Sequence, residues 1–178
     1  MYVFRSTLSF VLGGTLFMLL VAQLNHAIFP LHIFCGGLLV TYSAFHLHPR
    51  AGFWGIFIVG LLMDARSPIP FGTQGILLLA LHTLLFRFRD EFARNETLTR
   101  IGVASLANFL YLLVVVVVSN RSAPVHLLDV LAGFVISQAF VIIVTPWFFA
   151  AQDRLARFVA PARGGAHIHR ARSTWLTR

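Results

Sequence analysis

The sequence is short of charged residues. Only 11% of its 178 residues are charged, whereas 58% are hydrophobic, and the mean hydropathy is +0.82. A soluble globular domain carries roughly 25% charged residues. This balance excludes an ordinary soluble domain and predicts an integral membrane protein.

Cysteine is almost absent, and lysine is absent altogether. The single thiol, Cys35, cannot form an internal disulfide, and no metal-binding spacing such as CxxC exists. Cys35 lies inside an apolar segment, so we expect it to pack as a small hydrophobic side chain. His167 and His169 resemble a metal-binding pair, but no third ligand accompanies them, and we expect no metal site.

Motifs that carry catalytic chemistry are missing as well. The sequence has no phosphate-binding glycine loop, no HExxH or GxSxG motif and no cysteine–histidine pairing. Four of the six carboxylates lie among arginines, where a solvated surface accounts for them: Asp90, Glu91, Glu96 and Asp153. We therefore expect a protein that is not an enzyme and that holds no cofactor.

Six apolar segments predict six membrane-spanning helices, at residues 8–24, 27–45, 51–65, 71–86, 101–118 and 125–151. Lipid leaves only helices and closed barrels as spanning structures, and these runs are too long and too little alternating for barrel strands. The third and fourth segments are short, because a span usually needs roughly 17–25 residues. They form either two short spans or one re-entrant hairpin. We favour two spans, because a hairpin would place Asp64 and Arg66 near the bilayer middle.

The arginines indicate the orientation of the chain. With six spans and both termini inside, all arginines but Arg66 and Arg121 fall in inside regions, as the positive-inside rule expects. We predict a six-helix membrane domain at residues 1–151 and a basic cytoplasmic tail at residues 152–178. The tail begins with either a short interfacial helix or the frayed end of the sixth helix. Its charge is expected to contact anionic lipid rather than nucleic acid.

Three polar side chains lie inside the later apolar segments: His82, Asn108 and Gln138. Polar groups at such positions usually face the bundle interior and form hydrogen bonds across helices. We predict helix–helix contacts for them, and a transport pathway is the alternative.

The central stretch, residues 52–75, has an unusual pattern of small and acidic residues. Gly52, Gly60 and Asp64 lie along one helical stripe, because steps of four residues stay near one face. Small residues on this stripe let a neighbouring backbone approach closely. Asp64 is expected to pair with Arg66 or to cap the following turn, and Asp129 could pair likewise with Arg121.

This stretch carries a resemblance to a known family. The run GLLMD at residues 60–64, followed by Pro70-Phe71-Gly72, resembles the "G-L-x-x-D … P-x-G" core of the bacterial rod shape-determining protein MreD family. The run PWFF at residues 146–149, with arginines after it, also resembles the closing segment of that family.

The resemblance implies a non-enzymatic, multi-pass subunit in the bacterial inner (cytoplasmic) membrane. Such proteins serve cell-wall elongation, and so rod shape and lateral peptidoglycan synthesis. They associate with the scaffold MreC and, through it, with MreB, the glycan polymerase RodA and a class B penicillin-binding protein. The family fold resembles the six-helix substrate-binding subunits of energy-coupling-factor transporters.

The resemblance also suggests roles for the motif residues. Gly52, Gly60 and Gly72 would permit close helix packing, while Asp64 and Pro70 would fix the outer turn. If Asp64 contacts a partner, Asp64→Ala should weaken complex assembly while membrane insertion stays intact.

The alternative function is a substrate-binding membrane subunit of a small-molecule, vitamin-type transporter. Such a subunit would share the helix count and the sidedness. A polar pocket near the outer surface, lined for instance by His82, Asn108 or Gln138, would favour the transporter. A closed apolar bundle with an exposed apolar groove would favour the scaffold-associated subunit.

Overall fold

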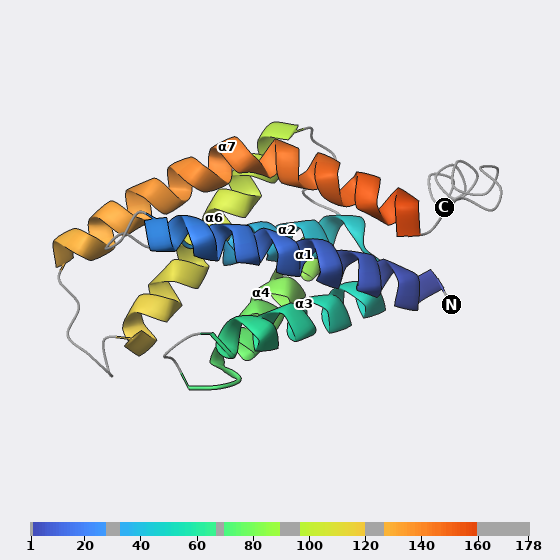
Figure 1. Cartoon of the computed structure of the whole chain (residues 1–178), viewed down its shortest axis with the longest axis horizontal. Helices are drawn as coiled ribbons and strands as arrows, with labels where there is room; N and C mark the ends of the chain where they lie inside the picture. The colour runs from blue at the N-terminus through green and yellow to red at the C-terminus, as the bar shows by residue number, and fades with distance from the viewer. Residues whose placement is uncertain (1, 28–32, 67–69, 90–96, 120–126, 160–178) are drawn as a thin grey trace.

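The computed structural model describes residues 2–27, 33–66, 70–89, 97–119 and 127–159. Within these ranges the chain forms six helices and no strand (Figure 1). The helices are α1 (Tyr2–Ala27), α2 (Gly36–His46), α3 (Pro49–Asp64), α4 (Thr73–Arg87), α6 (Thr97–Ser119) and α7 (Leu127–Val159). The prediction of an all-α protein is therefore confirmed.

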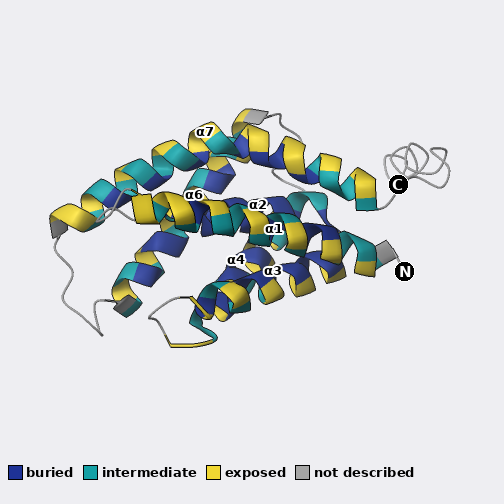
Figure 2. Cartoon of the chain, in the orientation of Figure 1, coloured by how far each residue is buried: buried dark blue, intermediate teal, exposed yellow. Residues whose placement is uncertain are grey.

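Three of the helices are long and apolar enough to cross a membrane, over Val3–Ala27, Leu98–Val118 and Leu128–Val159. Helix α4 is a shorter apolar helix. The outer faces of the bundle carry many exposed apolar side chains (Figure 2). On α1 they repeat every four residues as a leucine stripe: Leu8, Leu12, Leu16, Leu20 and Leu24. An apolar exterior and three candidate spans indicate a multi-pass membrane protein.

Successive helices run in opposite directions, so the bundle has two distinct ends. At one end, here termed the terminal end, α1 begins, α7 finishes and α2 meets α3 (Figure 1). At the other, the distal end, α1 and α6 finish and the turn between α3 and α4 lies. Among the described arginines, Arg66 alone lies at the distal end; those at or near the terminal end are Arg5, Arg50, Arg87, Arg89, Arg100, Arg154 and Arg157.

Helix α2 lies at the centre of the bundle. It packs against α3, α4, α6 and α7, and its residues from Gly36 to Ala44 are all buried. At the terminal end, the Tyr42 ring stacks on Phe10 of α1 with ring centroids 5.9 Å apart. The Tyr42 hydroxyl donates a hydrogen bond to Asp153 of α7 at 3.0 Å. Asp153, which we expected to belong to a solvated surface, therefore helps to join α2 to α7.

The second expected span, residues 27–45, differs most from the structure. Ala27 belongs to α1, Ile33 to Cys35 are irregular, and α2 begins only at Gly36. With 11 residues, α2 is about 16 Å long, roughly half the thickness of a bilayer core. Within the described residues, the second apolar segment therefore forms a short helix preceded by irregular backbone rather than one continuous span.

The last helix is longer than the sequence suggested. Helix α7 continues without a break from Leu127 to Val159, with Pro146 inside it. Residues 152–159 are consequently the final turns of α7 and not a separate helix. The boundary that we placed after residue 151 lies within this helix. The rest of the expected tail, residues 160–178, lies outside the described residues.

Candidate functional site

Helices α3 and α4 form a close-packed hairpin along the glycine stripe. A Cβ atom added to Gly60 would lie 2.5 Å from the Cα atom of Gly75 on α4. A Cβ atom added to Gly52 would lie 2.7 Å from the ring of His82, also on α4. Both glycines thus lie where the second helix leaves no room for a side chain.

The carboxylate of Asp64 organises the turn of this hairpin. It is 3% exposed and accepts hydrogen bonds from the backbone N–H groups of Gly72 at 3.0 Å, Gln74 at 2.9 Å and Gly75 at 3.0 Å. These donors lie at the start of α4, where backbone N–H groups lack helical partners and a negative charge is favourable. Asp64 therefore caps α4. Within the described residues it makes no ion pair with Arg66. Of the two roles expected for Asp64, capping of the turn is therefore the one that the structure shows.

The turn itself requires a glycine. Gly72 has a φ of +93°, a left-handed conformation that glycine adopts without steric cost. The carbonyl of Pro70 accepts hydrogen bonds from the backbone N–H of Thr73 at 3.2 Å and from its hydroxyl at 2.7 Å. The motif residues after Asp64 thus shape the chain so that its N–H groups point at the carboxylate. Asp129 lies exposed in the first turn of α7, and Arg121, its expected partner, is outside the described residues.

The three polar residues singled out inside the apolar segments do not meet at one site. His82 lies 2.9 Å from the Ser43 hydroxyl, a contact between α4 and α2. Gln138 of α7 lies 2.7 Å from the Ser105 hydroxyl of α6. Asn108 of α6 is fully buried and contacts the chain before and at the start of α2. Each of the three residues forms hydrogen bonds to a different neighbouring segment.

Side chains from other helices satisfy the irregular backbone at residues 33–35. The amide of Asn25, near the end of α1, exchanges two hydrogen bonds with Ile33: it accepts from the N–H at 2.7 Å and donates to the carbonyl at 3.2 Å. Ser137 of α7 accepts a hydrogen bond from the N–H of Phe34 at 2.9 Å. Non-helical backbone is tolerated at membrane depth only where protein or a cavity surrounds it.

Asn108 completes this support from the opposite side. Its amide nitrogen donates to the carbonyl of Phe34 at 2.9 Å, and its oxygen accepts from the N–H of Gly37 at 3.3 Å. One side chain thus bridges the last irregular residues to the first turn of α2. Within the described part of the chain, the break in the second apolar segment leaves the Ile33 and Phe34 peptide groups fully bonded.

We expect Asn108→Leu to destabilise the protein by about 2–4 kcal/mol, because the Phe34 carbonyl and the Gly37 N–H would stay buried without partners. The measurement is the free energy of unfolding in mixed detergent micelles as denaturing detergent is added. Gln138→Leu is the matched control: it removes one interhelical contact between side chains and should cost no more than about 1 kcal/mol. Equal losses in the two variants would contradict the bridging role of Asn108.

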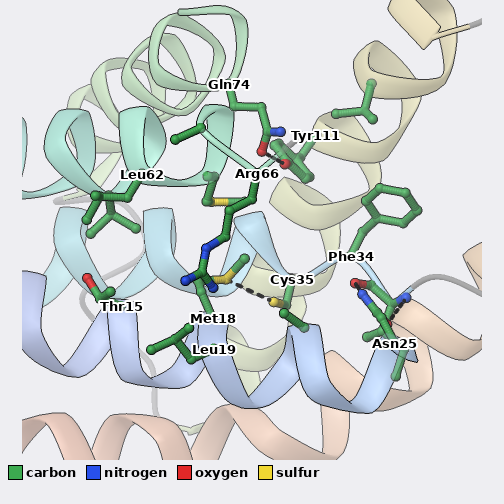
Figure 3. Close-up of a pocket in the computed structure, with 16 residues that line it drawn as sticks. Thr15, Met18, Leu19, Asn25, Phe34, Cys35, Leu62, Arg66, Gln74 and Tyr111 are labelled. Atoms are coloured by element: carbon green, nitrogen blue, oxygen red, sulfur yellow. Dashed lines mark hydrogen bonds between the residues drawn. The ribbon is translucent and has the colours of Figure 1, made fainter. Parts of the chain in front are cut away.

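A cavity of about 510 Å³ lies beside the irregular segment at the distal end of the bundle (Figure 3). Its volume is within the range of small-molecule sites. Residues from α1, the irregular segment, α3 with the residues that follow it, α4 and α6 line it: Thr15, Met18, Leu19, Ala22, Asn25, Ile33, Phe34, Cys35, Val59, Leu62, Met63, Ala65, Arg66, Gln74, Tyr111 and Val115. His82, Asn108 and Gln138 are not among them.

The polar part of the cavity wall is small. Gln74 accepts a hydrogen bond from the Tyr111 hydroxyl at 2.8 Å, and both side chains are buried. Arg66 is the only charged residue among the described lining residues, and its guanidinium makes no ion pair or hydrogen bond to another described residue. Figure 3 shows its side chain reaching over the cavity towards Met18 and Cys35. The arrangement suits binding: a mostly apolar enclosure with one cationic group at its edge.

Two of the lining residues were named from the sequence, but for other roles: Cys35 as a small packed side chain and Arg66 as a partner of Asp64. Asn25, Gln74 and Tyr111 were not named from the sequence, because Asn25 follows the first apolar segment and the other two lie within apolar runs. Among the described residues, no group of histidine, cysteine or acidic side chains is placed to hold a metal ion. His167 and His169 lie outside the described residues.

Comparison with protein-family models, with curated proteins and with solved structures finds no match to this chain.

Proposed function

We propose that the chain is a non-enzymatic membrane subunit of the bacterial cell-wall elongation complex, of the kind represented by the MreD family. In this role it would associate with an MreC-like scaffold in the inner membrane and, through it, with MreB, RodA and a class B penicillin-binding protein. The protein would contribute a binding surface within the bilayer and would catalyse no reaction.

The observation that carries this proposal is the construction of the α3–α4 hairpin. The residues that resemble the family core act together in one unit. Gly60 admits the backbone of α4, Gly72 takes a left-handed turn, and Asp64 accepts three hydrogen bonds from the α4 start. A motif whose members depend on one another in this way is less easily explained by the general abundance of glycine and leucine in membrane helices.

The arrangement of charge supports the sidedness that the proposal needs. Arg66 is the one described arginine at the distal end, and the other described arginines lie at or near the terminal end. Under the positive-inside rule, the terminal end would face the cytoplasm and the α3–α4 turn would face outward. Six spans with both termini inside are part of this proposal, and they would suit a fold like that of energy-coupling-factor substrate-binding subunits.

A second candidate function is a substrate-binding subunit of a small-molecule transporter. The irregular backbone before α2 and the adjacent cavity favour it, because unwound backbone within the membrane often borders binding sites in transporters. The cavity lies at the distal end, where we expected a transporter pocket, but its lining differs from the polar residues that we named for it.

Affinity purification separates the two functions. The tagged full-length protein would be extracted from its own host in mild detergent, and the co-purifying proteins would be identified by mass spectrometry. We expect an MreC-like scaffold and wall-synthesis enzymes, each enriched at least about tenfold over an unrelated tagged membrane protein, which corresponds to about 1.4 kcal/mol of preferential association.

A different set of partners would overturn the first proposal. Recovery of a pair of ATPases and a coupling membrane subunit, without wall-synthesis proteins, would establish the transporter instead. Recovery of neither set, from cells in which the tagged protein supports normal growth, would contradict both functions.

A further inference from the structure

The cavity at the distal end has the size and the walls of a ligand site. Its volume of about 510 Å³ suits one small ligand rather than a few waters. Most of its lining is apolar, including Met18, Leu19 and Leu62. Methionine side chains adapt to irregular ligand shapes. This part of the wall would favour an alkyl chain or an apolar ring system.

One end of the cavity carries the positive charge of Arg66, which is exposed and which no described residue pairs with. Arg66 lines the cavity and forms no ion pair within the described ranges. The nearest carboxylate along the chain, Asp64, is not in the lining, because the three N–H groups at the start of α4 hold it. The cavity edge therefore presents a cation to any ligand that enters.

Gln74 adds a hydrogen-bond donor to the wall. Gln74 is 6% exposed, and its amide oxygen is occupied by the Tyr111 hydroxyl. Its amide nitrogen has no hydrogen-bond partner among the described residues and is left to donate. The side-chain amide of Asn25, by contrast, both donates to and accepts from the backbone of Ile33. The unused capacity of Arg66 and Gln74 fits an acceptor-rich anion, since a guanidinium binds carboxylate and phosphate groups strongly.

We propose that this cavity binds one amphiphile that has an apolar body and a carboxylate or phosphate head. The apolar body fills the space between α1, α3 and α6, and the head lies beside Arg66 near the α3–α4 turn. The proposal rests on the cavity and its charges, and it holds for either of the functions proposed above.

Ligand binding can be measured directly on the purified full-length protein. The probes are dodecyl phosphate and its neutral counterpart dodecanol, and native mass spectrometry in a non-ionic detergent counts the bound molecules. We expect one dodecyl phosphate per protein. Arg66→Gln should weaken binding of dodecyl phosphate about tenfold, the loss of one charge-assisted contact, and leave binding of dodecanol unchanged. Arg87→Gln, an exposed arginine at the end of α4, is the matched control and should bind both probes normally.

A second pair of variants tests the cavity itself. Ala22→Phe and Leu19→Trp both add bulk to the α1 side of the wall, so each should abolish binding of both probes. The unfolding temperature of each variant shows whether it is folded. If one variant is unfolded, probe binding to the other variant tests the cavity. Wild-type binding in a folded blocking variant, or unchanged phosphate binding in Arg66→Gln, would overturn the proposal, as would a failure of the wild type to bind dodecyl phosphate.

The same preparations identify where the natural ligand comes from. Organic extraction of the wild-type protein purified from host membranes, followed by mass spectrometry, should yield an anionic lipid that folded Ala22→Phe lacks if the bilayer supplies the ligand. If no lipid is retained but dodecyl phosphate still binds, the ligand is an anionic amphiphile that arrives from the aqueous side. Both results support the proposed head-group chemistry.

Discussion

Asp64→Ala is expected to lower the free energy of unfolding by about 3–6 kcal/mol, a large share of the stability of a domain of this size. The carboxylate is 3% exposed and accepts three backbone hydrogen bonds at the start of α4. Its removal leaves three N–H groups without partners in a region from which water is largely excluded. It also removes a negative charge from the positive end of the α4 dipole.

Unfolding of the purified variants in mixed micelles, followed by circular dichroism, measures this loss. Asp129→Ala is the matched control, because Asp129 is exposed in the first turn of α7 and should contribute no more than about 1 kcal/mol. Asp64→Asn keeps one acceptor oxygen but loses the charge, so it should fall between the wild type and Asp64→Ala.

These hydrogen bonds revise the expectation drawn from the resemblance. We had expected Asp64→Ala to spare membrane insertion and to weaken complex assembly. A buried cap predicts loss of stability first, and loss of partners only as a consequence. A variant with wild-type unfolding and impaired partner recovery would instead assign Asp64 to a partner contact and would contradict the capping role as the main one.

Gly37→Ala is expected to destabilise the protein by at least about 3 kcal/mol, at or beyond the upper range for an overpacked core. The added methyl carbon would lie 2.1 Å from the backbone nitrogen of Asn108 and 2.4 Å from its Cα atom. Both are backbone atoms of α6, so no side-chain rotation relieves the clash. Helices α2 and α6 must separate, and the hydrogen bonds that join Asn108 to Gly37 and to Phe34 then break.

The matched control for this variant is Gly102→Ala in the same packed pair of helices. A Cβ atom at Gly102 meets nothing within 4 Å, so alanine should stabilise α6 by about 0.5–1 kcal/mol through its higher helix propensity. The two substitutions add the same methyl group and should act in opposite directions on the unfolding midpoint. Equal midpoints would show that α2 and α6 are not in such close contact.

The coarse character of the fold could be read from the sequence. Scarcity of charge together with long apolar runs predicted a helical membrane protein, because lipid permits few alternatives. The glycine stripe indicated close packing of a neighbouring backbone, and Asp64 and Pro70 indicated a turn after it, because these residues act through local geometry. The helical nature of the chain and the α3–α4 turn could thus be predicted from the sequence, because each depends on residues that are close along the chain.

The irregular backbone before α2 was not predicted from the sequence. Residues 27–45 are mostly apolar, so we expected one span, although Pro30 and the pair Gly36-Gly37 are local signals of a helix boundary. The irregular backbone is stabilised by Asn25, Asn108 and Ser137, which lie 8, 74 and 103 residues from their partners along the chain. No local pattern reports contacts over such separations, and the cavity depends on the same long-range assembly.

The competition for Asp64 shows a second limit. The sequence left a pair with Arg66, two residues away, and a cap of the following turn as alternatives. The structure places three backbone donors around the carboxylate instead, and they are already fixed by the turn at Gly72. A flexible arginine side chain must lose conformational freedom to compete with donors that are held in place. The Arg66 side chain consequently lines the cavity without an ion-pair partner among the described residues.

The unequal lengths of the helices have a consequence for the surrounding lipid. Helices α3 and α4, with 16 and 15 residues, are about 24 Å and 22 Å long, whereas α1, with 26 residues, is about 39 Å long. A bilayer core is roughly 30 Å thick, so α1 is long enough to cross it and α3 and α4 are each shorter than its thickness. In the proposed six-span topology, the acyl chains next to α3 and α4 would have to compress or tilt, at a cost that grows with each ångström of mismatch. The bilayer next to the protein would thus be locally thinner, and this thinner region would favour short-chain lipids and other short helices.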